Sequence, residues 1–184
     1  MGRWRTRANA VTSLRLLLAP LLVLAILREA WPWACLLLAL AVVSDLADGY
    51  VARRFVEVSP LGGLVDHGVD AIFVASGTLA LAWLGALPML LPGLILVAFA
   101  QYALDSRVGA NRALRPSALG RFNGIAYFGI LALSLLSAGV SLPGPADTTL
   151  WWLGWLLVST TLLSMGDRAL ASFRARRGPV GNQS

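Results

Sequence analysis

The sequence predicts an all-α membrane protein that crosses a bilayer with six helices. Of its 184 residues, 58% are hydrophobic and only 13% are charged, which is unusual for a soluble domain. The hydrophobic residues also form long runs, each close to the roughly 20 residues that a helix needs to cross a hydrocarbon layer. We expect membrane spans at residues 13–30, 32–50, 64–86, 88–105, 119–140 and 148–168.

The runs leave no room for a separate soluble domain. We therefore expect one membrane domain over residues 1–178 and a short C-terminal tail at 179–184. Residues 1–12 are polar and carry arginines at alternate positions, which favours a short N-terminal helix lying on the anionic inner leaflet. The first run is expected to remain as a mature helix, because Arg15 interrupts it and no small-residue cleavage site follows.

Prolines and glycines indicate where the spans begin and end. Pro32 suits the first turn of the second span. After that span we expect a break at Ser59-Pro60, and a tight reversal at Gly62-Gly63 before the third span. Further boundaries are expected at Pro88, Pro92, Pro116, Pro143 and Pro145.

Arginine gives the orientation, because all fifteen basic residues are arginines and cytoplasmic loops retain positive charge. An even number of spans places both termini on one side. If that side is cytoplasmic, every arginine except Arg28 lies inside. Tryptophans favour the membrane interface, and six lie near the expected outer ends: Trp31, Trp33, Trp83, Trp151, Trp152 and Trp155. The sequence thus predicts a bacterial inner-membrane protein with cytoplasmic termini.

This topology also accounts for the net charge of +6. The arginines lie at helix ends and in loops and do not alternate with exposed aromatic residues, so we expect no nucleic-acid partner. Cys35 is the only cysteine, which excludes a disulfide or a thiolate metal site within one chain.

Four aspartates stand out against this apolar background. Asp45 and Asp48 are three residues apart, and Asp66 and Asp70 are four apart, so each pair lies on one helix face. An ionised Asp at the centre of a membrane helix costs about 2.5–3.5 kcal/mol on insertion scales, so four together need a compensating partner. Both pairs lie at the cytoplasmic ends of consecutive spans, where they can converge on one site.

Four carboxylates without histidine or cysteine ligands suit Mg²⁺ or Mn²⁺, and two ions can share such a set. Gly49 and Ala52 give the helix a surface without bulk beside the first pair, and Arg53 adds a cation suited to phosphate. The combination predicts a site for a nucleoside diphosphate and for phosphoryl transfer, provided that one carboxylate can accept a proton.

Eight residues of this region also carry a resemblance to a known family: Asp45, Asp48, Gly49, Ala52, Arg53, Gly62, Asp66 and Asp70. They read D-x2-D-G-x2-A-R-x8-G-x3-D-x3-D from Asp45 to Asp70, and this resembles the signature of the CDP-alcohol phosphatidyltransferases at every fixed position. A second pattern typical of many members, N-x2-T-x2-R-x4-P, is matched by Asn9, Thr12, Arg15 and Pro20. The resemblance implies a six-helix membrane enzyme, in similar proteins a homodimer, that transfers a phosphatidyl group from a CDP-linked lipid to an alcohol and releases CMP.

The resemblance also implies roles for single residues. Asp45, Asp48 and Asp66 would bind one metal ion, and Asp45, Asp66 and Asp70 the second. Asp70 would in addition be the base that deprotonates the acceptor hydroxyl. Gly49, Arg53 and Ser59 align with positions that contact the CDP moiety in similar proteins.

The acceptor alcohol is left open among glycerol 3-phosphate, an inositol phosphate, another small polar alcohol and a lipid alcohol. Many bacterial members that use glycerol 3-phosphate carry D-P-x-A-D-K across the second pair, whereas this chain lacks that proline and that lysine at His67 and Ala71. Arg112, Arg115 and Arg121 are candidates for holding a phosphorylated acceptor, although the positive-inside rule alone also explains arginines there.

Two other classes remain as alternatives. Intramembrane prenyltransferases also use aspartates and Mg²⁺, but they need two separated motifs. A transporter or ion-binding protein could also carry membrane carboxylates.

His67 is expected at the rim of the site and not as a metal ligand. Four aromatic residues are expected to face lipid or pack between helices: Phe99, Tyr102, Phe122 and Tyr127.

Overall fold

The part of the chain that the computed structural model describes consists of six helices and two tight turns. The backbone is described for residues 7–55, 60–108, 118–140 and 145–177, and the side chains for 14–46, 63–104, 119–140, 148–171 and 173. The helices are α1 (Arg7–Leu27), α2 (Trp31–Phe55), α3 (Pro60–Trp83), α4 (Leu90–Val108), α5 (Ala118–Val140) and α6 (Pro145–Arg177). Each helix contains one of the apolar runs, so the all-α prediction is confirmed.

Not every helix reaches membrane-spanning length within its described apolar part. Gly63–Trp83, Leu119–Val140 and Thr148–Ala171 are long and apolar enough to cross a bilayer, whereas the apolar stretches of α1, α2 and α4 are shorter. Residues 7–12 form the first turns of α1, and residues 1–6 lie outside the described chain. A separate N-terminal helix is therefore not confirmed.

The two tight turns end α1 and α3 in the same way. After α1, the Ala30 N–H donates to the Ala25 carbonyl and the Glu29 N–H to that of Ile26, while Glu29 adopts a φ of 54°. After α3, Gly85 has a φ of 81°, the conformation that glycine adopts without strain. Both turns have the hydrogen-bond pattern of a Schellman cap, which satisfies the last carbonyls of a helix.

The start of α3 corrects one sequence prediction. The helix begins at Pro60, so Gly62 and Gly63 lie inside its first turns and do not form a reversal. Proline has no N–H to lose at the start of a helix and its φ is already helical, which favours initiation at Pro60. Glycine within a helix costs only about 1 kcal/mol, so initiation outweighs it.

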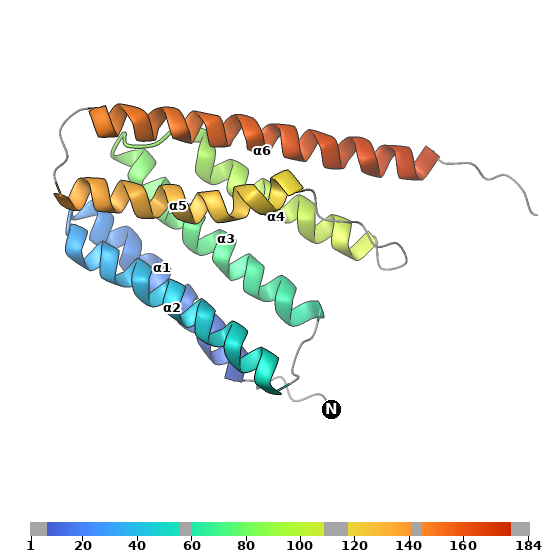
Figure 1. The fold of residues 1–184 in the computed structure, drawn as a ribbon, viewed down its shortest axis with the longest axis horizontal. Helices are drawn as coiled ribbons and strands as arrows, with labels where there is room; N and C mark the ends of the chain where they lie inside the picture. Colours follow the sequence, from blue (N-terminus) through green and yellow to red (C-terminus); the bar gives the residue numbers. More distant parts are fainter. Residues whose placement is uncertain (1–6, 56–59, 109–117, 141–144, 178–184) are drawn as a thin grey trace, which may run out of the picture.

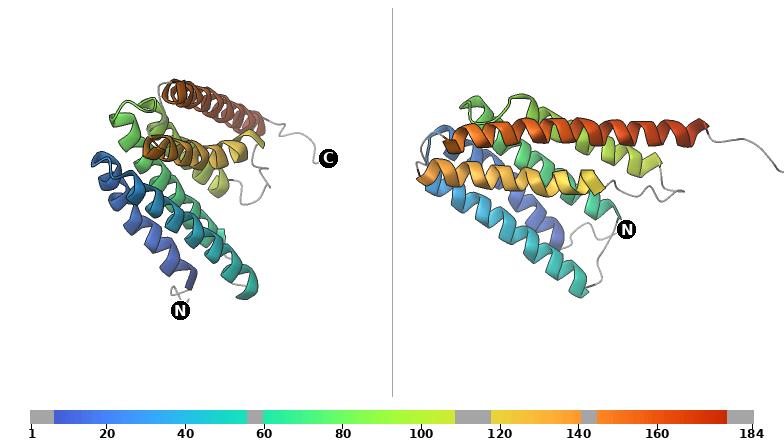
Figure 2. Two further views of the ribbon diagram at one scale, coloured as in Figure 1. Left: turned by 60° about the vertical axis from the view of Figure 1, so that its left-hand side comes forward. Right: turned by 45° about the horizontal axis from the view of Figure 1, so that its top comes forward.

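The helices lie close together at one end of the molecule and spread apart towards the other. In Figure 1 the short turns α1–α2 and α3–α4 are on the left, while the ends of α2 and α6 diverge on the right; both views in Figure 2 agree. Leu22, Phe73 and Leu131 are fully buried where α1, α3 and α5 meet. Gly77 lies at the same point, and a Cβ there would come within 2.9 Å of the Leu131 side chain.

Polar and apolar residues are distributed as in a membrane protein. Large apolar side chains such as Leu17, Leu163 and Val140 are exposed on the outside of the helices. Among the described residues, eight polar or charged side chains are instead buried: Arg15, Ser44, Thr78, Asn123, Ser134, Ser137, Thr161 and Ser164. Polar groups within a membrane bundle usually face one another or a functional cavity.

Candidate active site

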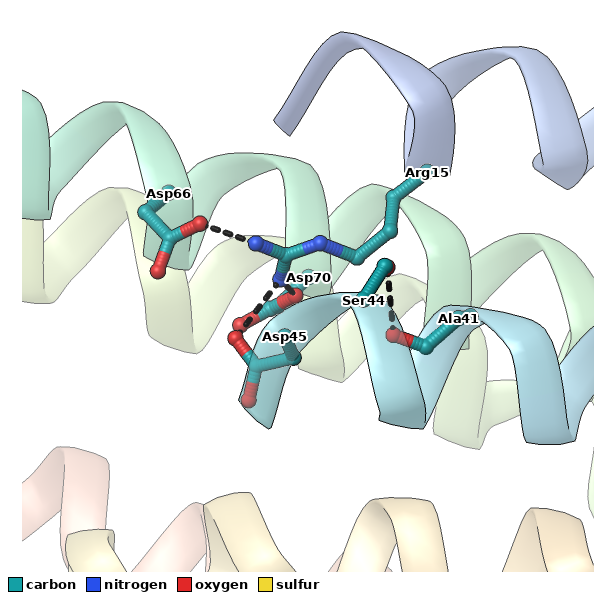
Figure 3. Close-up of polar contacts among 6 residues, drawn as sticks. All are labelled: Arg15, Ala41, Ser44, Asp45, Asp66 and Asp70. Carbon is teal, nitrogen blue, oxygen red and sulfur yellow. Dashed lines mark hydrogen bonds and ion pairs between the residues drawn. The ribbon is translucent and has the colours of Figure 1, made fainter. Parts of the chain in front are cut away.

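A buried arginine lies at the centre of the predicted carboxylate site. The Arg15 side chain extends from α1 and is only 1% exposed, although it carries a charge. Its guanidinium donates hydrogen bonds to Asp66 and Asp70 of α3, and its Nη1 lies 3.1 Å from the Asp45 Oδ1 of α2. Figure 3 shows the guanidinium between the three carboxylates. Three helices thus contribute to one ionic cluster.

The local structure explains this convergence. Asp66 and Asp70 are one helical turn apart on α3, and therefore share a face. The residue before Asp45, Ser44, is buried and donates its hydroxyl to the Ala41 carbonyl at 2.7 Å. Since α1 packs against both α2 and α3, a long side chain from α1 can reach both.

In the sequence, Arg15 stands out only as a basic residue near the start of the first span and as part of the pattern N-x2-T-x2-R-x4-P. The available signal was its position, because it is a lone charge within an otherwise apolar run. A buried charge is costly unless it is paired, so a partner from another helix had to be expected. Which helix supplies that partner depends on the three-dimensional packing.

The three described carboxylates fit a hard divalent cation. One oxygen from each of Asp45, Asp66 and Asp70 can be chosen so that all three lie within 4.8 Å of one another. The set consists of oxygen ligands, which suit Mg²⁺ or Mn²⁺ and not a soft metal. The described cluster contains three carboxylates and only one guanidinium, that of Arg15. The excess negative charge would attract a divalent cation.

The carboxylates differ in their access to solvent. The side chains of Asp45, Asp66 and Asp70 are 46%, 31% and 18% exposed. Asp45 therefore lies at the open edge of the cluster, and Asp70 at its most enclosed point. A charged ligand would approach from the Asp45 side.

A cavity of about 590 Å³ adjoins the cluster. Asp45 and Asp70 belong to its wall, and its other described lining residues come from α3, α4, α5 and α6. Much of the wall is apolar and includes Val74, Ile95 and Phe128. A cavity with an apolar wall and carboxylates at one side suits a ligand that is partly apolar and partly phosphorylated.

Aromatic and cationic residues line the same cavity. Arg121 of α5 belongs to its wall, and so does Arg168 of α6, whose guanidinium lies 5.6 Å from the centre of the Tyr102 ring. His67 also lines the cavity and meets Tyr102 edge-on at 6.2 Å. The role of His67 beside the carboxylates remains a prediction.

Three of the aromatic residues pack between helices, as predicted, and also line the cavity. Tyr127 belongs to the buried core, and a Cβ at Gly68 of α3 would lie 3.2 Å from the Phe99 ring. Phe99, Tyr102 and Tyr127 all belong to the cavity wall. Phe122 is 64% exposed, as expected for a lipid-facing residue. The sequence could not separate these positions because all four lie in similarly apolar helices, and the neighbouring helix decides which face is covered.

A polar seam between α5 and α6, made by Asn123, Tyr127, Thr160 and Thr161, is a feature that sequence reasoning missed. The Thr160 hydroxyl donates to the Asn123 Oδ1 at 3.0 Å. The Tyr127 hydroxyl lies 2.6 Å from the Thr161 Oγ1. Asn123, Tyr127 and Thr161 are at most 8% exposed, and all three belong to the cavity wall.

Several predicted site residues cannot be placed at the level of side chains. Asp48, Gly49, Ala52 and Arg53 lie on α2, next to Asp45 along the helix, but their side chains are outside the described part. Ser59, Arg112 and Arg115 lie outside the described residues altogether. Their roles remain predictions.

The fold and the site define a membrane-embedded enzyme whose carboxylates can hold a divalent metal beside an amphipathic cavity. Residues 5–163 match the family model of the CDP-alcohol phosphatidyltransferases. The chain belongs to this family, and its activity is CDP-alcohol phosphatidyl transfer in phospholipid synthesis. Family membership favours this reaction over the prenyltransferase and transporter alternatives, and it makes the chain a membrane protein.

Similarity to three relatives extends over most of the chain. It is 32% identical to a cardiolipin synthase (CMP-forming) of Streptomyces coelicolor, over 83% of this chain and 81% of the relative. It is 30% identical to a CDP-diacylglycerol–glycerol-3-phosphate 3-phosphatidyltransferase of Cereibacter sphaeroides, over 78% of this chain and 70% of the relative. A probable cardiolipin synthase of Drosophila melanogaster is 28% identical over 86% of this chain and 56% of its own length.

Proposed function

We propose that this chain transfers the phosphatidyl group of CDP-diacylglycerol to a lipid alcohol, phosphatidylglycerol, so that the products are cardiolipin and CMP. The cavity carries this proposal, because its largely apolar wall beside Asp45 and Asp70 suits an acceptor with acyl chains. The Streptomyces coelicolor and Drosophila melanogaster relatives named as cardiolipin synthases support the same acceptor. So does the lack of the proline and lysine typical of glycerol 3-phosphate-using members, at His67 and Ala71.

Glycerol 3-phosphate is the second candidate acceptor. The Cereibacter sphaeroides relative is named for it, and Arg121 and Arg168 in the cavity wall could bind a phosphate monoester. The two candidates differ in their apolar part and not in the group that reacts. An acceptor panel separates them.

The carboxylates have distinct tasks in this proposal. Asp45, Asp48, Asp66 and Asp70 would hold two Mg²⁺ or Mn²⁺ ions, which would supply positive charge to balance the diphosphate. Asp70 takes the proton of the acceptor hydroxyl. The hydroxyl oxygen forms a bond to the β-phosphorus of the donor, the bond from this phosphorus to CMP breaks, and CMP leaves with the electron pair.

The remaining predicted residues position the two substrates. Gly49 and Ala52 allow the CDP moiety to approach α2, while Arg53 and Ser59 bind its polar groups. Arg121 binds the phosphate of the acceptor, and Arg112 and Arg115 add positive charge nearby. The enclosed position of Asp70 relative to Asp45 supports its role as the base, since the reacting hydroxyl must be kept from water.

We further propose that all six helices cross the membrane, with both termini and the site on the cytoplasmic side of a bacterial inner membrane. The arginine distribution supports this orientation. The N-terminal segment lies on the inner leaflet, and the enzyme is a homodimer, as the family resemblance implies.

The test is turnover by the purified protein in detergent micelles. CDP-diacylglycerol is mixed with phosphatidylglycerol, glycerol 3-phosphate or inositol phosphate, with Mg²⁺ or Mn²⁺, and CMP and the lipid product are measured. We expect CMP and cardiolipin with phosphatidylglycerol. CMP release with glycerol 3-phosphate alone would replace the proposed acceptor. Release of CDP in place of CMP would mean that the carbon–oxygen bond of the donor breaks, and would contradict the reaction.

A further inference from the structure

Within the described part of the chain, the side-chain amide of Asn123 has a hydrogen-bond partner for its oxygen and none for its nitrogen. The side chain is 2% exposed and lines the cavity that adjoins Asp45 and Asp70. Its Oδ1 accepts a hydrogen bond from the Thr160 hydroxyl at 3.0 Å, and that hydroxyl also lies 3.1 Å from the Leu157 carbonyl. The Nδ2 of Asn123 is buried and has no hydrogen-bond partner among the described residues. A buried donor without a partner costs roughly 1–3 kcal/mol, so such a group in a cavity wall points to a ligand.

Tyr127 lies on the same face of α5 and supplies a hydrogen-bond acceptor, whereas Asn123 supplies a donor. The Thr161 hydroxyl donates to the Leu157 carbonyl at 2.6 Å, which uses its only proton. In the contact between the two hydroxyls, Tyr127 must therefore be the donor and Thr161 the acceptor. The phenolic oxygen of Tyr127 keeps its own lone pairs for a hydrogen bond from another group.

Donor and acceptor are thus arranged one helical turn apart. Asn123 and Tyr127 are four residues apart on α5, which places them on one face. Both belong to the wall of the cavity that contains Asp70. An alcohol hydroxyl can accept from the amide and donate to the phenolic oxygen at the same time, because it has one proton and two lone pairs.

We propose that Asn123 and Tyr127 bind the second, non-reacting hydroxyl of the acceptor, so that the enzyme selects a vicinal diol over a simple alcohol. The inference rests on the proposed function, because it assumes an alcohol acceptor in this cavity. It adds the substrate class: phosphatidylglycerol and glycerol 3-phosphate both carry a hydroxyl adjacent to the one that reacts. Asn123 and Tyr127 determine specificity and take no part in proton transfer.

The test compares acceptors that differ by this one hydroxyl. Phosphatidylglycerol is compared with phosphatidyl-1,3-propanediol, which keeps the terminal hydroxyl and lacks the central one. We expect the wild-type protein to prefer the diol by about tenfold or more in kcat/KM, since a site built for a hydroxyl is left with unpaired groups by the analogue. Asn123→Leu should lose about tenfold with the diol and change little with the analogue.

Two further variants separate specificity from folding. Tyr127→Phe removes only the phenolic oxygen and should reduce the preference in the same direction. Ser134→Ala is the matched control, because Ser134 is a buried hydroxyl on α5 that, within the described residues, lies outside the cavity wall. It should keep the wild-type preference. An Asn123→Leu protein that loses activity equally with both acceptors, or keeps the wild-type ratio, would overturn the proposal.

Failure of the inference and failure of the proposed function give different results. Turnover of phosphatidylglycerol with no preference over its analogue refutes diol recognition and leaves the reaction in place. Turnover of glycerol 3-phosphate only would replace the acceptor, and the same comparison with 3-hydroxypropyl phosphate then tests the diol site. Absence of CMP with every acceptor overturns both.

Discussion

Arg15 Nη1 lies 3.1 Å from Asp45 Oδ1 and also donates to Asp70, so one guanidinium connects α1 to the carboxylates of α2 and α3. The arginine is almost completely buried, while its three partners retain partial contact with solvent. The arrangement holds together carboxylates that would otherwise repel one another. It therefore links the stability of the bundle to the geometry of the metal site.

Replacement of Arg15 should destabilise the metal-free protein. Arg15→Leu leaves three close carboxylates without the guanidinium, and removing one partner of a buried ion pair costs about 3–5 kcal/mol. We expect a loss of roughly 2–4 kcal/mol, because Asp45 is half-exposed and water can screen part of the repulsion. The melting temperature in detergent measures the effect. Added Mg²⁺ should recover part of the loss.

Arg28→Ala is the control for that experiment. Arg28 is an exposed arginine in the α1–α2 turn, far along α1 from the cluster. Its removal should change the melting temperature little, with or without Mg²⁺. Equal loss in both variants, or no response of Arg15→Leu to Mg²⁺, would show that the guanidinium does not balance the carboxylates.

Asp70→Asn should abolish most turnover while the protein stays folded. The amide cannot take a proton from the acceptor, and loss of a positioned base typically costs about 10²–10⁴ in rate. CMP release with saturating donor and acceptor measures kcat. Asp167→Asn provides a matched change on α6, because Asp167 is exposed and lies outside the described cavity wall. Comparable activity of the two variants would exclude Asp70 as the base.

Metal removal should stop the reaction reversibly. EDTA treatment is expected to abolish CMP release, and Mg²⁺ or Mn²⁺ to restore it, because the described ligands are carboxylate oxygens. Binding of Mn²⁺, followed by electron paramagnetic resonance, should give two ions per chain. Asp45→Ala should lower this number, since Asp45 is expected to ligate both. Full activity in EDTA would contradict a divalent-metal site.

The sequence predicted the helices and the shared helix face of Asp66 and Asp70 because both depend on local spacing. Apolar runs define α1 to α6, and a four-residue interval places Asp66 and Asp70 on one face. The role of Arg15 could not be predicted in the same way, since it depends on how α1 packs against α2 and α3. The seam of Asn123 and Thr160 depends likewise on the contact between α5 and α6.

Gly154 should be the glycine most sensitive to substitution among those described. A Cβ at this position of α6 would overlap the Pro88 ring in the α3–α4 turn, and a proline ring cannot rotate away as a leucine side chain can. We expect Gly154→Ala to reduce the free energy of unfolding by about 1–3 kcal/mol by overpacking.

Gly129 of α5 provides the control, because among the described residues nothing lies within 4 Å of a Cβ added there. Gly129→Ala should therefore be neutral or stabilise the helix by up to about 1 kcal/mol. Thermal unfolding of the two variants in the same detergent compares them, and an equal or larger loss in Gly129→Ala would mean that α6 does not pack closely against this turn.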